Sequence, residues 1–293
     1  MYHLIILIIC ILILVYILYP LKNKQKYYLE NYKTCPYGKI DTIDIYKKMY
    51  IPKTIYIYWD STTYPKLIKN TIGSIMRHNS SWRIRVLDIS HVNILSLTLP
   101  ELNNLSKAHQ SDYIRLYYLA NYGGVYLDAS IICFDSIDKW VNIYSNSIQG
   151  FKVPFNSYTL ETWALGVPKN NIFCRAWLNE FTKSIKIGFD NYCKQLSTDI
   201  IPYNDDLRNL LPYLTINACW KVVYNKLKSP HIIYDSFPLK YINENALLTL
   251  LTDVNHKIEV PMIKLREADR ILFIKHLHKL NKSTDFAQRF NYY

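Results

Sequence analysis

The alternation of apolar and polar positions separates the chain into an N-terminal apolar run, a polar connecting stretch and a long patterned body. Tyr2–Leu21 contains twenty residues without a formal charge. A helix of that length spans about 30 Å, the thickness of the hydrocarbon core of a bilayer. No Lys or Arg precedes the run, which disfavours a cleaved signal peptide, and its apolarity on every side disfavours a buried helix with one solvated face. We therefore predict an uncleaved transmembrane anchor over residues 1–21 and a stem over residues 22–50.

The body from residue 51 alternates short β-branched and aromatic runs with segments whose apolar residues recur every three or four positions. The first pattern predicts strands and the second predicts helices. Up to residue 150, we expect strands over 54–59, 83–88 and 125–127 and helices over 64–78 and 106–122. Further on, we expect helices over 170–187, 207–227 and 266–280 and strands over 231–235 and 259–265. This order favours an α/β fold with a mostly parallel central sheet, and we expect a single domain over residues 51–293.

Several side chains of catalytic type come together if this fold is correct. Ligands of parallel sheets bind beyond the carboxyl ends of the strands, and Trp59 and Asp128 lie at two such ends. Asp112 and Arg115 are three residues apart on a predicted helix and share a face. Gly123-Gly124 permits a sharp reversal from that helix into the strand that delivers Asp128. Singly, these are ordinary ion-pair, cap and turn residues, but together they could hold sugar hydroxyls, a phosphate and a divalent metal.

The same residues carry a resemblance to a known family. Ser111-Asp112-Tyr113-Ile114-Arg115, followed by residues 122–130 (YGGVYLDAS), resembles the core of sugar-nucleotide glycosyltransferases with a DXD-type motif. These are the family 32 enzymes and the related capsular-polysaccharide-synthesis proteins. Three flanking stretches resemble the same family, at residues 51–59 (IPKTIYIYW), 161–163 (ETW) and 261–265 (PMIKL). The resemblance therefore spans about residues 51–265.

The resemblance implies a nucleotide-binding fold of the GT-A type and assigns roles by position. Asp112 and Arg115 would contact the donor sugar or its phosphates, and Trp59 would lie near the nucleotide base, where an aromatic face can stack. Asp128 would be the first acid of the DXD-type motif, near metal, ribose and sugar. A divalent cation, Mn²⁺ or Mg²⁺, would neutralise the diphosphate as it leaves.

Position 130 departs from the family pattern. Ser130 stands where the motif has its second Asp, the more direct metal ligand, and a neutral hydroxyl is a weaker partner for a hard cation. Asp128 and Ser130 are still the expected metal ligands, with metal dependence less firmly indicated than for a strict DXD enzyme. By the same resemblance, Glu161 would face donor sugar and acceptor, and Lys264 would offset diphosphate charge. The alternatives are a salt-bridged glutamate and a surface lysine.

The net charge and the cysteine content exclude some classes of protein. The net charge is +12 and the pI is about 9.2, but the positive residues are spread singly except for Lys22, Lys24 and Lys26. A nucleic-acid partner is therefore not expected. The lysines after the apolar run place the body in the cytosol by the positive-inside rule, whereas enzymes of this kind often act in a lumen, so the side of the membrane stays open. Six Cys without a C-x-x-C pair indicate neither a disulfide framework nor a zinc site, and we expect mostly buried thiols.

These observations favour a membrane-anchored glycosyltransferase that moves a sugar from a UDP- or GDP-linked donor to a glycan, lipid or protein acceptor. The family is mostly anomer-retaining, so the resemblance implies retention. No pair of acid/base carboxylates is evident in the sequence, so we expect catalysis to rest chiefly on positioning and leaving-group stabilisation. One alternative, motivated by Ser130, is a catalytically degenerate member of the fold that only binds glycans or nucleotides. Another, motivated by the net charge, is a membrane-tethered basic protein that acts on anionic surfaces.

Overall fold

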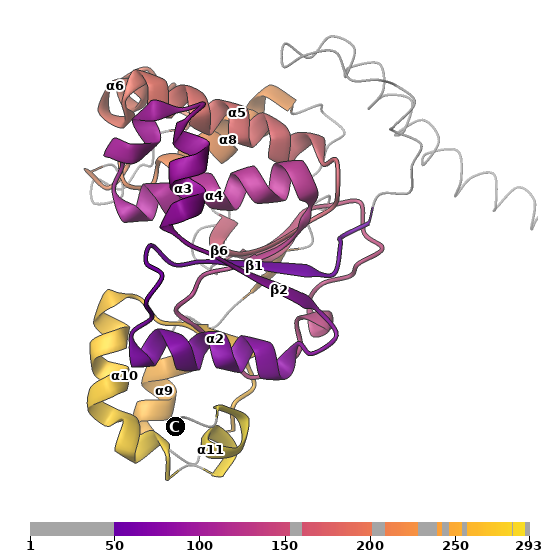
Figure 1. The fold of residues 1–293 in the computed structure, drawn as a ribbon, viewed down its shortest axis with the longest axis vertical. Helices are drawn as coiled ribbons and strands as arrows, with labels where there is room; N and C mark the ends of the chain where they lie inside the picture. The colour runs from indigo at the N-terminus through magenta and orange to yellow at the C-terminus, as the bar shows by residue number, and fades with distance from the viewer. Residues whose placement is uncertain are drawn as a thin grey trace, which may run out of the picture. The chain divides into compact units, whose positions relative to one another are not determined.

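A mixed sheet of six strands lies at the centre of the computed structural model (Figure 1). The structure describes residues 50–152, 160–200, 209–227, 239–241, 246–253, 257–282 and 284–290. The residues described all belong to one compact unit. The predicted anchor, and the predicted stem up to residue 49, lie outside the described residues. Within the described ranges, no helix is both long enough and apolar enough to cross a membrane.

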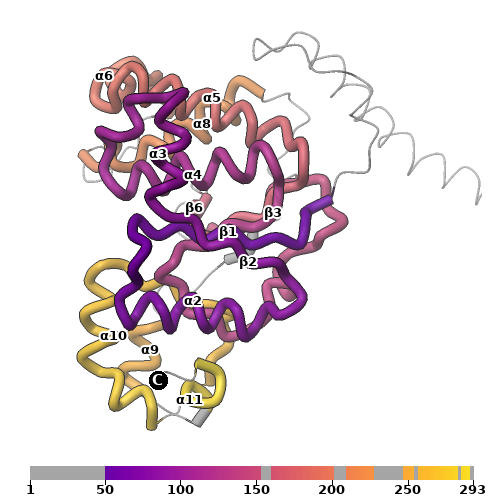
Figure 2. Tube along the Cα trace, in the orientation of Figure 1, coloured from indigo at the N-terminus to yellow at the C-terminus, as the bar shows by residue number. Residues whose placement is uncertain are grey.

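The order of strands in the central sheet is β2-β1-β3-β6-β5-β7. These strands are β1 Thr54–Tyr58, β2 Arg83–Leu87, β3 Gly124–Leu127, β5 Gln149–Lys152, β6 Leu160–Val167 and β7 Leu239–Tyr241. A separate two-stranded sheet pairs β4 Ile131–Cys133 with β8 Met262–Lys264. Figure 2 shows β1, β2, β3 and β6 side by side along the trace of the chain.

The central sheet is mixed: five of its six strands run in one direction and β6 runs against them, so the predicted mostly parallel sheet is confirmed apart from β6. β1 is parallel to β2 and β3, and β5 is parallel to β7, but β6 runs antiparallel to both β3 and β5. Parallel neighbours need a long crossover, usually a helix. Helices supply that crossover between β1, β2 and β3. After β3 the described residues reach β6 through β4 and β5 and contain no α-helix, and β6 returns in the opposite direction.

The helices of the first half match the predicted pattern, apart from one that it did not indicate. They are α2 Lys66–His78, α3 Ile89–Ser96, α4 Lys107–Tyr122 and two 3₁₀ turns, η2 Pro100–Asn104 and η3 Ile137–Lys139. Those of the second half are α5 Ile172–Ile187, α6 Phe189–Lys194, α8 Thr215–Leu227, α9 Ala246–Thr252, α10 Glu267–Leu280 and α11 Thr284–Phe290. The predicted strand over 231–235 and residues 207–208 of a predicted helix lie outside the described residues. The sequence pattern did not indicate the elements α3, α6, α9, α11, β4, β5, β6 and β7.

Helices cover both faces of the central sheet. Side chains of β1 alternate, so that Ile55 and Ile57 join a core on the α2 side while Tyr56 and Tyr58 join a core on the α4 side. In Figure 1, α3, α4, α5, α6 and α8 lie on one side of the sheet and α2, α9, α10 and α11 lie on the other. A strand buried on both faces has few polar positions, which explains the continuous apolar runs in the sequence.

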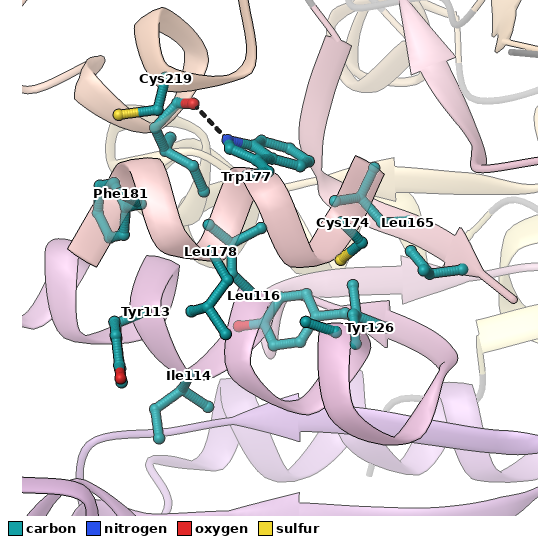
Figure 3. Close-up of a cluster of buried hydrophobic side chains, with 14 of the residues drawn as sticks. Tyr113, Ile114, Leu116, Tyr126, Leu165, Cys174, Trp177, Leu178, Phe181 and Cys219 are labelled. Carbon is teal, nitrogen blue, oxygen red and sulfur yellow. Dashed lines mark hydrogen bonds between the residues drawn. The ribbon is translucent and has the colours of Figure 1, made fainter. Parts of the chain in front are cut away.

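The core on the α4 side fixes this helix against the sheet. Figure 3 shows side chains of α4 and α5, including Leu116 and Leu178, packed around the buried Tyr126 of β3. The indole of Trp177 is fully buried, and its N–H donates to the carbonyl of Ile216 over 2.8 Å, which ties α5 to α8. Burial of each such large side chain stabilises the fold by roughly 1.5–3 kcal/mol. The position of α4 beside β3 is therefore set by apolar packing and not by its polar residues.

Candidate functional site

The helix α4 and the strand β3 are joined by the glycine pair that the sequence indicated. Gly123 ends α4 with a φ of 66°, and Gly124 opens β3 with a φ of 113°. A Cβ on Gly124 would lie 2.7 Å from the carbonyl oxygen of Thr54 in the neighbouring strand. Both the left-handed conformation and the close approach to β1 thus require glycine. The pair turns the chain directly from α4 into β3, so that the two elements lie against each other.

Arg115 joins the two acids that the sequence singled out. Its Nη1 donates to Oδ1 of Asp112 over 2.8 Å, and its Nη2 donates to Oδ1 of Asp128 over 2.8 Å. The Arg115 side chain is 4% exposed, and its guanidinium lies 4.7 Å from the centre of the Tyr126 ring. The Tyr126 hydroxyl in turn hydrogen-bonds Ser111 over 2.9 Å. The structure therefore brings Asp112, Arg115 and Asp128 together as predicted.

Lys264 approaches Asp128 from the opposite side. Its Nζ donates to Oδ2 of Asp128 and, over 3.0 Å, to Oγ of Ser130. Asp128 is thus held between Arg115 from α4 and Lys264 from β8, with one carboxylate oxygen for each cation. The side chains of Asp128 and Lys264 are 18% and 20% exposed, so this end of the cluster faces solvent while Arg115 is buried.

Backbone pairing fixes the position of Lys264. In the antiparallel pair β4–β8, Ile131 lies opposite Lys264, and the amide of Leu265 donates to the carbonyl of Ser130 over 3.0 Å. The turn that contains Ser130 is also held by α2, because the Thr71 hydroxyl donates to the carbonyl of Ala129 over 2.6 Å. The buried hydroxyl of Thr71 could not have been assigned this role from sequence, since nothing in the pattern links α2 to the turn.

The two acids differ in their protonation. Burial alone would raise the pKa of Asp128, but the adjacent Lys264 and Arg115 outweigh it and hold that pKa below its usual range. Burial raises the pKa of Asp112 to about 7, with Asp128 adding to the rise and Arg115 opposing it. The pKa of Asp128 is the lower of the two because two cations contact its carboxylate. Near neutral pH the cluster therefore holds Asp128 ionised, whereas Asp112 takes up a proton more readily.

Trp59 and Glu161 lie in segments beside β3. Trp59 directly follows β1 and Glu161 lies in β6, and both of these strands pair with β3. Trp59 follows β1 at the same sheet edge as Asp128, as the parallel register of β1 and β3 requires, and its partly buried side chain packs against the core on the α2 side. Glu161 lies in β6, two residues before Trp163, whose carbonyl accepts the amide of Asp128 over 2.9 Å. The backbone thus places both residues in elements next to Asp128. Their expected roles stay predictions.

Arg270 is a basic residue at this site that the sequence reasoning missed. It lies in α10, which begins three residues after Lys264, and it is close enough to lower the pKa of Lys264 in addition to the lowering by burial. Its Nε is buried without a hydrogen-bond partner among the described residues. The sequence did contain a signal for it: one basic residue, Lys264, lies near the end of a predicted strand, and another, Arg270, lies near the start of the next predicted helix.

The expected metal ligands fit a divalent cation poorly. Mg²⁺ and Mn²⁺ favour about six oxygen ligands, of which protein sites usually supply more than one carboxylate. Here Asp128 offers one carboxylate whose two oxygens already accept from Arg115 and Lys264, and Ser130 offers a neutral hydroxyl in contact with the same lysine. No group of three or more His, Cys, Asp or Glu residues suited to a metal occurs in the described part of the chain. The metal requirement therefore stays a prediction.

An α/β sheet with acidic and basic side chains beyond its parallel strand ends has the arrangement of a ligand-binding α/β protein. The chain belongs to the capsular polysaccharide synthesis protein family, whose sequence profile matches residues 20–281. A curated relative, the probable glycosyltransferase FCK3 of Fusarium pseudograminearum (strain CS3096), is 30% identical over 159 residues. That match covers 47% of this chain and 40% of the relative, so the chain spans less than half of the relative's length.

Solved structures show distant likeness. The PaToxG glycosyltransferase is 13% identical, with a TM-score of 0.41 and coverage of 85% of this chain and 81% of that chain. The galactosyltransferase LgtC, in complex with donor and acceptor sugar analogues, is 14% identical, with a TM-score of 0.41 and coverage of 78% and 95%. GlyE of Streptococcus pneumoniae TIGR4 is 12% identical, with a TM-score of 0.40 and coverage of 82% and 62%. The GT-A assignment stays a prediction.

Proposed function

We propose that the chain is a membrane-anchored glycosyltransferase that moves a sugar from a nucleoside-diphosphate donor to a hydroxyl of a glycan, lipid or protein. The observation that carries the proposal is the ionised, partly exposed Asp128, held at the end of β3 between Arg115 and Lys264. Membership of the capsular polysaccharide synthesis protein family and the likeness to a probable glycosyltransferase support it.

The charges of the cluster suit a donor of this chemistry. The solvent-facing oxygens of Asp128 retain lone pairs that can accept from sugar or ribose hydroxyls, since each carboxylate oxygen can accept twice. Arg115 is too deeply buried to be a contact for a large ligand, so we assign it to positioning Asp128. Lys264, partly exposed beside Asp128, can face the diphosphate. Trp59, at the same sheet edge, is the proposed neighbour of the base.

The reaction exchanges one bond to the anomeric carbon for another. The bond between sugar C1 and the diphosphate oxygen breaks, and its electron pair leaves with the nucleoside diphosphate. A bond forms between C1 and the acceptor oxygen, whose proton passes to the leaving phosphate or to solvent. Asp128 would fix the sugar, and fixed positive charge would stabilise the departing diphosphate, so that catalysis rests on positioning and electrostatics. We propose retention at C1 on the family resemblance.

The test is a donor screen with the purified full-length chain in detergent. We expect slow hydrolysis of at least one UDP- or GDP-linked sugar, measured as release of the nucleoside diphosphate. Asp128→Asn and Asp128→Ala should lower the rate by about 10²–10³-fold, the size of effect seen when an electrostatic contact to a reacting group is lost. The exposed Asp190 of α6 offers a matched control, and Asp190→Ala should retain the full rate.

Two outcomes would contradict the proposal in different ways. Full activity of both Asp128 variants would show that the site is elsewhere. Binding of a nucleotide sugar without turnover under any condition would favour the catalytically degenerate alternative. Melting curves of each variant separate loss of activity from loss of fold.

A further inference from the structure

We propose that Lys264 supplies the fixed positive charge that a divalent metal supplies to the diphosphate in DXD-type transferases, so that this enzyme binds its donor without a metal. The inference rests on the proposed function and names the cation of the same site. The evidence for it is the position of the Lys264 ammonium between side-chain oxygens of Asp128 and Ser130.

The ammonium of Lys264 occupies the position that a metal ion would take. Asp128 and Ser130 are the two residues that the family pattern assigns to the metal, and Lys264 donates to a side-chain oxygen of each. A cation bound by the same two oxygens would have to displace this lysine. It would then lie beside the charges of both Lys264 and Arg115, which repel it.

The charge of the cluster is already balanced without a further ion. Asp112 and Asp128 contribute two carboxylates, while Arg115 and Lys264 contribute two cations. Because burial shifts Asp112 toward its protonated form, the balance near neutral pH moves toward positive charge. A diphosphate is favoured at such a site, whereas a divalent cation gains little from it.

Lys264 is held in place and still has capacity for a ligand. Its backbone pairs with Ile131 across β4–β8, so its backbone position is fixed by the sheet and not by a flexible loop. An ammonium has three N–H donors, and contacts with the described residues use two of them. The side chain is 20% exposed, so the third donor can reach an anion from solvent.

Arg270 adds a second cation from the adjoining segment. Its charge acts on Lys264 and lowers the pKa of that lysine in addition to the lowering by burial, and its Nε has no hydrogen-bond partner among the described residues. A guanidinium and an ammonium that act on the same ligand are a suitable pair for its two phosphoryl groups. When the bond between sugar C1 and oxygen breaks, the negative charge that develops on that oxygen would be stabilised by these two groups without transfer of their protons.

The experiment measures binding of UDP and of GDP to the full-length chain in detergent by isothermal titration calorimetry. Each titration is done with EDTA and, separately, with Mn²⁺ in place of EDTA. We expect the nucleotide that binds to do so with affinities in the two conditions that agree within about threefold, a difference below 1 kcal/mol. Lys264→Met should weaken binding about 10- to 100-fold in both conditions, as loss of a hydrogen bond to a charged group predicts.

Further variants keep the test independent of folding. Lys264→Arg retains the charge and should recover most of the affinity lost in Lys264→Met. Arg270→Gln lies outside the Asp128 network and should weaken binding while the melting temperature stays that of the parent chain. The exposed Lys194 of α6 gives a matched control, and Lys194→Met should bind as the parent chain does.

The possible failures are distinguishable. Binding that EDTA abolishes and Mn²⁺ restores would overturn this inference and leave the proposed function intact. Unchanged binding by a folded Lys264→Met variant would do the same. Absence of binding by UDP and GDP in both conditions, together with no hydrolysis of any UDP- or GDP-linked sugar, would remove the proposed function and this inference with it.

Discussion

The guanidinium of Arg115 is shared by two carboxylates, and this sharing makes the acids unequal. Asp128 has Lys264 as a second cation, whereas Asp112, in α4, is more deeply buried and gains less compensation for its burial. The more compensated acid keeps its charge, and the other takes up a proton more readily. Under the proposed function the two residues would therefore have different tasks: Asp128 would present charge to a ligand, and Asp112 would orient the guanidinium that holds it.

The raised pKa of Asp112 predicts a particular pH dependence of stability. Its folded-state pKa of about 7 lies above the unfolded value of 3.8, so its contribution is favourable at low pH and is lost as pH rises through about 7. We expect the melting temperature of the parent chain, relative to that of Asp112→Asn, to fall between about pH 4.5 and about pH 7.5. Melting curves of both proteins across this range provide the measurement. A difference that is constant with pH would show that Asp112 stays ionised.

The predictable part of the site is the part that is local in sequence. Helical spacing places Asp112 and Arg115 on one face, and the glycine pair returns the chain so that Asp128 meets them. The contact of Lys264 with Asp128 spans 136 residues and depends on the pairing of β8 with β4, which no local pattern encodes. The family resemblance alone directed attention to Lys264, and it gave no sign of Arg270.

At the scale of elements, the junction between α4 and β3 decides whether the site forms. Gly124 has a φ that is rarely accessible to residues with a side chain, and its backbone lies against β1. A displacement of the backbone at Gly124 would move Asp128 away from Arg115, because Arg115 lies in α4 before the turn and Asp128 follows β3 after it. The glycine pair is therefore a structural requirement of the site although it supplies no side chain to it.

Gly124→Ala should destabilise the chain by about 2–4 kcal/mol, from backbone strain at positive φ together with overlap of the new methyl with Thr54. Urea unfolding of the full-length chain measures this difference. Gly166 of β6 is the matched control, because a Cβ there has its nearest neighbours at 3.5 Å and its φ is not positive. Equal effects of the two substitutions would contradict the proposed cause.

Elements with a clear period were predictable, and strand direction after β3 was not. α2, α4, α5 and α10 follow from the spacing of apolar residues, and β1 and β2 from short β-branched and aromatic runs. The antiparallel placement of β6 against β3 and β5 becomes visible only when β5 and β6 are recognised as strands. These strands contain Gly150, Glu161 and Gly166, whose presence weakens the strand pattern.

At the scale of the whole described unit, helices on both faces of the sheet leave the cysteines of the interior without access to solvent. Cys133, Cys174 and Cys219 are buried and unpaired, whereas Cys193 is partly exposed. Burial raises the pKa of Cys133 to about 11 and also raises the pKa of Cys174. The expectation of buried free thiols is thus confirmed for three of the four cysteines that the structure describes.

Alkylation of the cysteines in the native full-length chain should follow their exposure to solvent. N-ethylmaleimide reacts with the thiolate, so we expect Cys193 to be modified well before Cys133, Cys174 and Cys219. Mass spectrometry of peptides sampled over time gives the order, and the same reaction in urea should modify all four at similar rates. Modification of Cys174 as fast as that of Cys193 in the native chain would mean that α5 does not pack as described.

The long separation between Asp128 and Lys264 has a consequence for synthesis on the ribosome. Translation proceeds from the N-terminus, so the acid and its guanidinium partner emerge well before the lysine 136 residues later. During that interval Asp128 has Arg115 as a partner but lacks the ammonium of Lys264. Under the proposed function, a product that ends before residue 264 should therefore bind a diphosphate more weakly than the full chain, because the ammonium beside Asp128 is missing.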